Sequence, residues 1–283
     1  MQKIILSLMI FILTLCQNCF PQTTSGELIS KIDSSLVQLV KIQELVKDIH
    51  PCLTKFHPVA IPDKDSLFIF DYDTTENEYG FVKETPQPFP LPEGIQASFP
   101  LSVYDNKPTC ILNPNTFGNP AGYSTVLHEF IHCCQYNSVE PGLKQSLEVY
   151  KAAMKHNDYS WEITYPFPYD DSLFIDYYDH FKASLEGNDI RSARLYRNKL
   201  KAHLSNTDFE YMLWEEWKEG LARYVENKIN SRMGIGINSY GKDKPYNRVS
   251  FYYSGELLIT RLAETDPGLP GEMKKLFMKM KEF

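Results

Sequence analysis

Hydrophobic positions divide the chain into an early part with strand-like runs and a later part with mostly helical spacing. Between residues 25 and 49, apolar side chains recur every three to four positions, which predicts an amphipathic helix that ends before Pro51. The run SLFIF at 66–70 predicts a buried strand. Two shorter strands are expected at 101–104 and 109–112.

Proline, glycine and asparagine mark the connections. Residues 74–100 are rich in Pro, Thr, Glu and Gly, which indicates a surface loop or a strand–loop excursion, and NPNTFGNPAG (113–122) is a dense turn signal. The order of strands first and helices later is typical of an α+β fold. Helices are predicted over 123–137, 142–156, 171–186, 189–204, 208–230, 250–265 and 270–282, with loops at 158–170 and 233–247.

The N-terminus has the pattern of an export signal. The start MQK carries one positive charge, and the uncharged run 4–15 is too short to cross a bilayer. We therefore predict that residues 1–22 are a signal peptide, that the protein is exported to the periplasm, cell envelope or medium, and that no transmembrane segment remains. A lipid anchor at Cys16 or Cys19 is the alternative, although Leu15 and Asn18 are poor residues before a lipidated cysteine.

The net charge and the cysteine content exclude some classes of function. With 29 Lys+Arg and 36 Asp+Glu, the net charge of −7 argues against nucleic-acid binding, which needs a basic face. Export makes a disulfide feasible, but the spacing of the four cysteines after residue 22 does not determine the pairing, and these four contain no CxxC pair that would indicate a cysteine zinc site. A bridge between adjacent cysteines within a helix would be strained. The four cysteines are Cys52, Cys110, Cys133 and Cys134.

The strongest local signal is VLHEFIH, residues 126–132. His128 and His132 are four positions apart, so on a helix they share one face and can bind one Zn²⁺. Glu129 lies beside them and has the place of a general base for a water molecule activated by the metal. A catalytic zinc needs a third protein ligand. The segment WEEWKEGLARYVE (214–226) offers Glu215, Glu216 and Glu219, and spacing does not choose among them.

HEFIH followed by WKEGLARYVE resembles the glutamate-zincin (gluzincin) metallopeptidases, particularly the aminopeptidase N-like branch. The resemblance implies that Glu219 is the third zinc ligand, that Gly220 and Ala222 are small packing positions, and that Glu226 is the later acidic residue of the motif. The segment FYYSGELL resembles the family's Y-x-x-G, which implies that Tyr252 donates a hydrogen bond to the developing oxyanion, with Tyr253 as the rival.

The resemblance also implies an architecture. We expect one zincin-like catalytic domain over 23–283, in which 23–137 hold a small mixed sheet and the HExxH helix, and 138–283 form a mainly helical part with the third ligand. The gap from His132 to Glu219 is 219 − 132 = 87 residues, so several helices must be inserted at about 138–207. The chain lacks G-x-M-E-N, the sequence that helps aminopeptidases of this branch to hold a free amine, so an aminopeptidase specificity is not supported.

The function expected from these residues is a zinc metallopeptidase with one Zn²⁺ per chain and a peptide or protein substrate. We expect the substrate to lie along an edge strand, for which 109–112, just before the HExxH helix, is the candidate. Three alternatives stay open: a catalytically inactive zincin-fold binding protein, a zinc hydrolase acting on a non-peptide amide, and an exported protein in which HEFIH is accidental.

Overall fold

The computed structural model describes residues 25–283. The predicted signal peptide, 1–22, and with it Cys16 and Cys19, lies outside the described residues. Within 25–283, none of the helices combines the length and the apolar character needed to cross a membrane.

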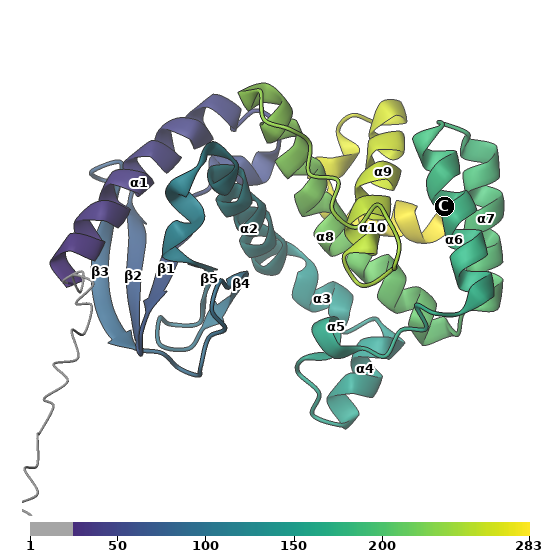
Figure 1. Ribbon diagram of the computed structural model, residues 1–283, viewed down its shortest axis with the longest axis horizontal. Coiled ribbons are helices and arrows are strands. Elements are labelled where there is room, and N and C mark those ends of the chain that lie inside the picture. Colours follow the sequence, from purple (N-terminus) through teal and green to yellow (C-terminus); the bar gives the residue numbers. More distant parts are fainter. Residues whose placement is uncertain (1–24) are drawn as a thin grey trace, which may run out of the picture.

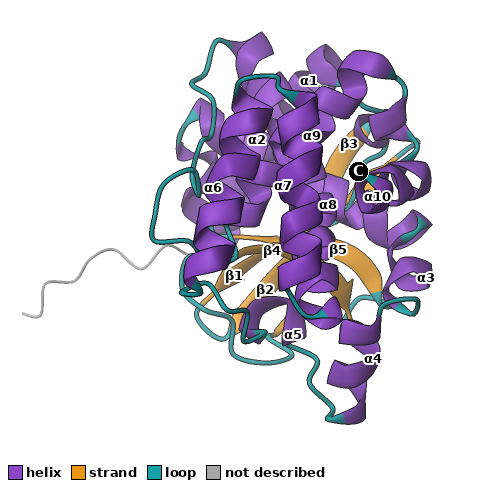
Figure 2. Ribbon diagram, turned by 90° about the vertical axis from the view of Figure 1, so that its right-hand side faces the viewer, coloured by secondary structure: helices purple, strands orange, loops and turns teal. Residues whose placement is uncertain are grey.

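The fold is α+β, with one five-stranded mixed sheet formed before residue 113 and mainly helices after it (Figures 1 and 2). The strands are β1 (Val59–Asp63), β2 (Ser66–Asp73), β3 (Glu78–Pro86), β4 (Gln96–Leu101) and β5 (Lys107–Leu112). The α-helices are α1 (Ser25–Val46), α2 (Pro120–Ser138), α3 (Glu140–Lys144), α4 (Glu148–Lys155), α5 (Trp161–Thr164), α6 (Ser172–Glu186), α7 (Ile190–His203), α8 (Asn206–Met233), α9 (Ser250–Thr265) and α10 (Met273–Glu282). Three short 3-10 helices are η1 (Pro51–Thr54), η2 (Pro114–Gly118) and η3 (Leu269–Gly271).

The sheet has the strand order β3-β2-β1-β5-β4. Only β1 and β5 are parallel, and every other pair is antiparallel. The central strands are apolar without interruption because both faces of the sheet are covered. One face packs with α1 and α2 into the main core, and the other is covered by the segments on either side of β4. The residues on the second face are Ala60, Leu67, Ile69, Leu101 and Ile111.

Helix α2, which carries the HEFIH motif, begins with a well-defined N-terminus. The side chain of Asn119 accepts a hydrogen bond from the backbone N–H of Gly122 (3.1 Å), and Pro120 occupies the first turn, where its missing N–H has no cost. A side chain at Gly122 could not fit, because a Cβ there would lie 1.5 Å from the carbonyl oxygen of Thr116. The turn-rich segment before the motif therefore sets where the helix starts and which way it runs.

The helical half of the molecule is built around α8, which is buried along most of its length (Figure 1). Helix α9 crosses α8 at very short range at two glycines. A Cβ on Gly220 would lie 2.6 Å from the Cα of Gly255, and a Cβ on Gly255 would lie 2.1 Å from the carbonyl oxygen of Glu216. This crossing brings the N-terminal turns of α9 next to the middle of α8.

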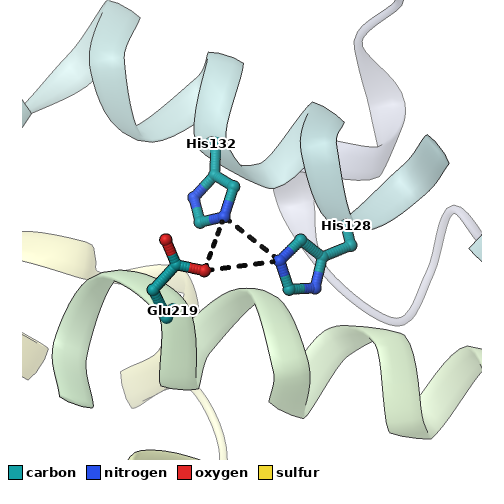
Figure 3. Close-up of side chains that lie close together, drawn as sticks. All are labelled: His128, His132 and Glu219. Carbon is teal, nitrogen blue, oxygen red and sulfur yellow. Dashed lines mark hydrogen bonds and ion pairs between the residues drawn. The ribbon is translucent and has the colours of Figure 1, made fainter. Parts of the chain in front are cut away.

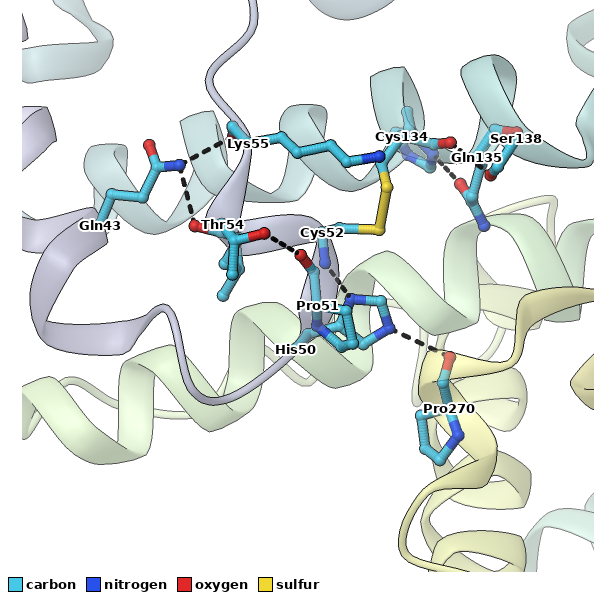
Figure 4. Close-up of a disulfide and its surroundings, with 12 residues drawn as sticks. Gln43, His50, Pro51, Cys52, Thr54, Lys55, Cys134, Gln135, Ser138 and Pro270 are labelled. Atoms are coloured by element: carbon cyan, nitrogen blue, oxygen red, sulfur yellow. Dashed lines mark hydrogen bonds between the residues drawn. A yellow bond between two sulfur atoms is a disulfide. The ribbon is translucent and has the colours of Figure 1, made fainter. Parts of the chain in front are cut away.

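A disulfide joins the segment after α1 to the motif helix. Cys52 in η1 is bonded to Cys134 in α2 (Figure 4). Cys110 and Cys133 are buried free thiols. The neighbouring His50 accepts a hydrogen bond from the N–H of Cys52 at Nδ1 and donates from Nε2 to the carbonyl oxygen of Pro270 (3.0 Å). Burial lowers the pKa of His50, so its neutral form is favoured.

Several predicted boundaries were wrong. A strand at 59–63 was not predicted, and the segment 74–100 contains all of β3 and most of β4. The predicted strand at 101–104 is mostly a turn, because β4 ends at Leu101, and the predicted helix at 142–156 is divided between α3 and α4. The strand at 109–112 is not an edge strand, because β5 lies between β1 and β4, and the edge strands are β3 and β4.

Candidate metal centre

Three side chains from two helices converge at one point. His128 and His132 stand one turn apart on α2, and Glu219 faces them from α8 (Figure 3). The two Nε2 atoms are 3.1 Å apart, and Oε2 of Glu219 lies 3.7 Å from Nε2 of His128 and 3.3 Å from Nε2 of His132. Within residues 25–283, this is the one group of three or more His, Cys, Asp or Glu side chains whose ligand atoms lie close enough to hold a metal ion.

The other ring nitrogen of each histidine has a hydrogen-bond acceptor. Nδ1 of His128 lies 2.9 Å from Oε2 of Glu226, and Nδ1 of His132 lies 2.8 Å from Oε1 of Gln135. Gln135 in turn donates from its Nε2 to the carbonyl oxygen of Lys218 (3.0 Å), which fixes the orientation of its amide. A neutral imidazole that donates from Nδ1 presents a lone pair at Nε2. In their neutral, metal-binding forms, both histidines therefore direct lone pairs at the same point.

This arrangement fits a zinc ion. Two lone pairs and a carboxylate oxygen that meet at 3.1–3.7 Å repel one another unless a cation or a proton lies between them. Ligand atoms about 2.0–2.1 Å from a tetrahedral zinc are separated by about 3.3 Å from each other, which is the spacing found here. Two imidazoles and one carboxylate are a ligand set of catalytic zinc sites, which keep a fourth position for water or substrate.

The surroundings of the three side chains favour positive charge. Burial lowers the pKa of His128, but the hydrogen bonds that its ring donates to Glu219 and Glu226 outweigh this effect and raise the pKa to about 10. Burial similarly raises the pKa of Glu219, and the two histidines reverse the effect and hold it well below its usual value. The balance of charges in this part of the protein is thus already suited to a cation.

Glu129, the candidate general base, is buried beside the two histidines, with 6% of its surface exposed. Its Oε2 atom is buried and has no hydrogen-bond partner. A buried polar atom without a partner is uncommon in folded proteins and calls for an explanation, such as a ligand or water bound at the site. The charge of Glu129 also acts on His128 and on Tyr252, so its carboxylate lies near the centre.

The two candidate tyrosines differ in their environments. The hydroxyl of Tyr253 donates to Oε1 of Glu186 (2.8 Å), away from the histidines. No described residue pairs with the hydroxyl of Tyr252. Burial and the carboxylates of Glu219 and Glu215 raise the pKa of Tyr252, which keeps its phenol protonated and able to donate. Of the two tyrosines, only Tyr252 has a pKa that is shifted by the charged residues of the centre.

The three glutamates of α8 between which sequence could not choose have separate partners. Glu215 is completely buried and pairs with Arg248, with Oε2 3.1 Å from Nη1. Glu216 is also completely buried, and it pairs with Arg197 and accepts a hydrogen bond from Ser254. Only Glu219 is directed at the histidines.

Sequence reasoning missed two residues of the centre. Gln135 was not predicted to have a role at the site, but it is fully buried and orients His132. Arg248 was not singled out, although it contacts Glu215 and lies 3.6 Å from Oε1 of Glu219. Helical spacing contains a signal for Gln135, which is three positions after His132. Arg248 lies in the turn before α9, where helical spacing gives no such signal. Comparison of the chain with family models, with curated proteins and with solved structures gives no match.

Proposed function

We propose that this protein is an exported zinc metallopeptidase with a zincin-like catalytic domain, in which His128, His132 and Glu219 hold one Zn²⁺. The observation that carries the proposal is the convergence of three ligand atoms from α2 and α8 while both Nδ1 atoms are occupied by acceptors. Two imidazoles and one carboxylate that converge in this way are the ligand set of a catalytic zinc site.

The proposed chemistry is hydrolysis of a peptide bond. When bound, zinc supplies a Lewis acid that acidifies water and polarises a carbonyl group. Glu129 accepts a proton from the attacking water, whose oxygen forms a bond to the carbonyl carbon. The same carboxylic acid then gives the proton to the nitrogen as the C–N bond breaks. Tyr252 donates a hydrogen bond to the carbonyl oxygen as it becomes negative, a contribution of roughly 3–4 kcal/mol for a well-placed donor.

The edge strand β4 favours a peptide as the substrate. β4 is paired on one side only, with β5, and it contacts α2. An extended peptide can add to such an edge through backbone hydrogen bonds, which read any sequence. Pro100 within β4 is compatible with this position, because proline is confined in sheets largely to edge strands.

Metal analysis and one isosteric variant test the proposal. We expect elemental analysis to find one zinc per chain, and we expect the His128→Ala/His132→Ala variant to contain none. Glu129→Gln should retain zinc and lose hydrolysis of unfolded proteins such as casein. Zinc-free wild-type protein after exposure to excess zinc, or full activity in Glu129→Gln, would contradict the proposal. A protein that binds zinc but cleaves neither casein nor a broad peptide library would favour the inactive binding protein or the non-peptide hydrolase.

A further inference from the structure

Arg248 lies between two glutamates of the centre. It precedes α9 and stands one turn before Tyr252, whose ring centroid is 5.1 Å from the guanidinium carbon. Its Nη1 lies 3.1 Å from Oε2 of Glu215 and 3.6 Å from Oε1 of Glu219. The carboxylate of Glu219 therefore lies between the guanidinium and the point where the ligand atoms meet.

The ion pair holds Arg248 but does not use all of its donors. A guanidinium has five N–H groups, and the contacts of Arg248 with Glu215 and Glu219 involve Nη1 alone. Among the described residues, none pairs with its Nε or Nη2, and neither atom is a buried unpaired one. The side chain is 29% exposed, whereas Glu215 is fully buried. Arg248 is thus anchored from the protein interior and keeps free N–H groups on its accessible part.

The place of these donors suits a substrate carbonyl. The guanidinium borders both the carboxylate of Glu219 and the ring of Tyr252, so a substrate carbonyl group bound between the ligand atoms and Tyr252 lies close to Arg248. A charged donor in a poorly solvated site stabilises a developing negative charge more than a neutral donor does. Because Arg248 is already held by Glu215, little reorganisation is needed when that charge appears.

We propose that Arg248 is a catalytic residue that donates to the substrate carbonyl oxygen as this oxygen gains negative charge, and that Glu215 is the positioning residue that holds its guanidinium in place. The proposal rests on the proposed metallopeptidase function and adds a cationic donor beside Tyr252. Its rival is a role for Arg248 in binding the terminal carboxylate of a peptide.

The first test measures binding rather than turnover. Benzylphosphonate, a tetrahedral anion, is titrated calorimetrically into zinc-loaded wild-type protein, Arg248→Ala, Arg248→Lys and Glu215→Gln, after the zinc content of each has been measured. We expect Arg248→Ala to keep one zinc and to bind the phosphonate about 10- to 100-fold more weakly. Glu215→Gln should show a smaller loss, and a low, non-denaturing concentration of guanidinium chloride should restore part of the affinity of Arg248→Ala only. Arg232→Ala, at an exposed ion pair with Asp48, is the matched control.

The second test separates the two roles of the arginine. On peptides with a free or an amidated C-terminus, we expect Arg248→Ala to lower kcat about 100-fold for both, with KM little changed. A rise in KM confined to peptides with a free C-terminus would overturn the proposal in favour of terminal carboxylate binding. Unchanged phosphonate affinity, or loss of zinc from both folded Arg248 variants, would also overturn it. A wild-type protein without zinc would instead contradict the proposed function itself, and this inference with it.

Discussion

At the scale of single residues, a chain of hydrogen bonds supports His128 from behind. Nδ2 of Asn238 donates to Oε1 of Glu226 (2.8 Å), and Oε2 of Glu226 accepts from Nδ1 of His128. Arg223 lies 3.4 Å from the same carboxylate and also donates to the carbonyl oxygens of Asn238 and Tyr240. Glu226 is thereby kept ionised and fixed, and burial, which would raise its pKa, is outweighed by His128 and its other partners.

Glu226→Gln tests the importance of this support. A neutral amide can turn its NH₂ group toward Nδ1, which would favour the tautomer whose Nε2 carries a proton and cannot bind metal. We expect zinc affinity to fall about 10- to 100-fold, the usual effect of altering a carboxylate behind a metal-binding histidine. Competition with a chromophoric chelator measures the zinc affinity of each variant. Glu264→Gln, in an exposed pair with Arg261, is the control. Equal affinity in the two variants would show that Glu226 does not tune the site.

Local spacing explains which residues of the centre could be predicted. His128, Glu129 and His132 are within one helical turn or so, so their identities and spacing suffice to place them on one face. Only the family resemblance favoured Glu219 over Glu215 as the third ligand, because both glutamates lie on the same face of the helix. The distinction between them depends on Arg248, 33 residues further along the chain from Glu215, and no periodicity reports a contact of that kind.

At the scale of elements, the α8–α9 crossing determines where Tyr252 and Arg248 lie. Gly220→Ala places a methyl group 2.6 Å from the Cα of Gly255, so the helices must separate. We expect the free energy of unfolding to fall by about 1–3 kcal/mol, the range for overpacking of a tight core, as measured by urea denaturation. In the control Gly236→Ala, the new methyl group has no atom within 4 Å. A Gly220→Ala variant as stable as this control would contradict the close crossing.

An ion-pair group joins α3, α5 and α8. Glu162 on α5 lies 2.5 Å from both Lys144 on α3 and Lys218 on α8. Burial would raise the pKa of Glu162, but Lys218 and Lys144 lower it to about 2. The folded state binds this proton more weakly than the unfolded state. The resulting stabilisation is therefore complete above about pH 4.5 and is lost as the pH falls towards 2.

The unfolding free energy of metal-free protein should show this loss. Between pH 4.5 and pH 2, a shift of this size corresponds to about 3 kcal/mol, and Glu162→Gln should lack this part of the pH dependence. Urea titrations at a series of pH values measure it, with Glu76→Gln in the exposed turn between β2 and β3 as the control. Parallel pH profiles for the wild type and Glu162→Gln would disprove the role of this carboxylate.

Sequence patterns located helices better than strands, for a physical reason. The spacing that identifies α8 or α9 lies within the helix itself, whereas β1 is a strand because of β2 and β5, and β5 lies about 50 residues further along the chain. β4 was hidden in a proline-rich segment and is paired on one side only. Sequence patterns likewise do not report that Arg197, in the basic segment 191–201, is buried, because its burial depends on the packing of α7 against α8 and on its ion pair with Glu216.

At the scale of the whole molecule, the predicted order of parts is present, but the way they are joined was not predictable. The strands come before residue 113 and the helical half follows α2, with α6 and α7 at the far end from the sheet (Figure 1). The connections between the halves include the contact of α2 with α8, the ion pair of Asp48 with Arg232, and the bond of His50 to Pro270 next to the disulfide. Four cysteines allow three full pairings, and the sequence does not indicate which are near one another.

The Cys52–Cys134 disulfide provides a test of how the N-terminal segment is held to the motif helix. It links residues 82 positions apart, and closing a loop of this length in the unfolded chain corresponds to about 4–5 kcal/mol of stabilisation in the chain-entropy model. We expect Cys52→Ser/Cys134→Ser to lower the unfolding free energy by up to this amount in urea. Dithiothreitol should destabilise the wild type and leave this variant unchanged. Cys110→Ala/Cys133→Ala is the matched control, because it removes two buried sulfurs that are 3.8 Å apart and not bonded to each other. It should remain sensitive to the reductant. If instead this control became insensitive and Cys52→Ser/Cys134→Ser stayed sensitive, the disulfide would lie between β5 and α2.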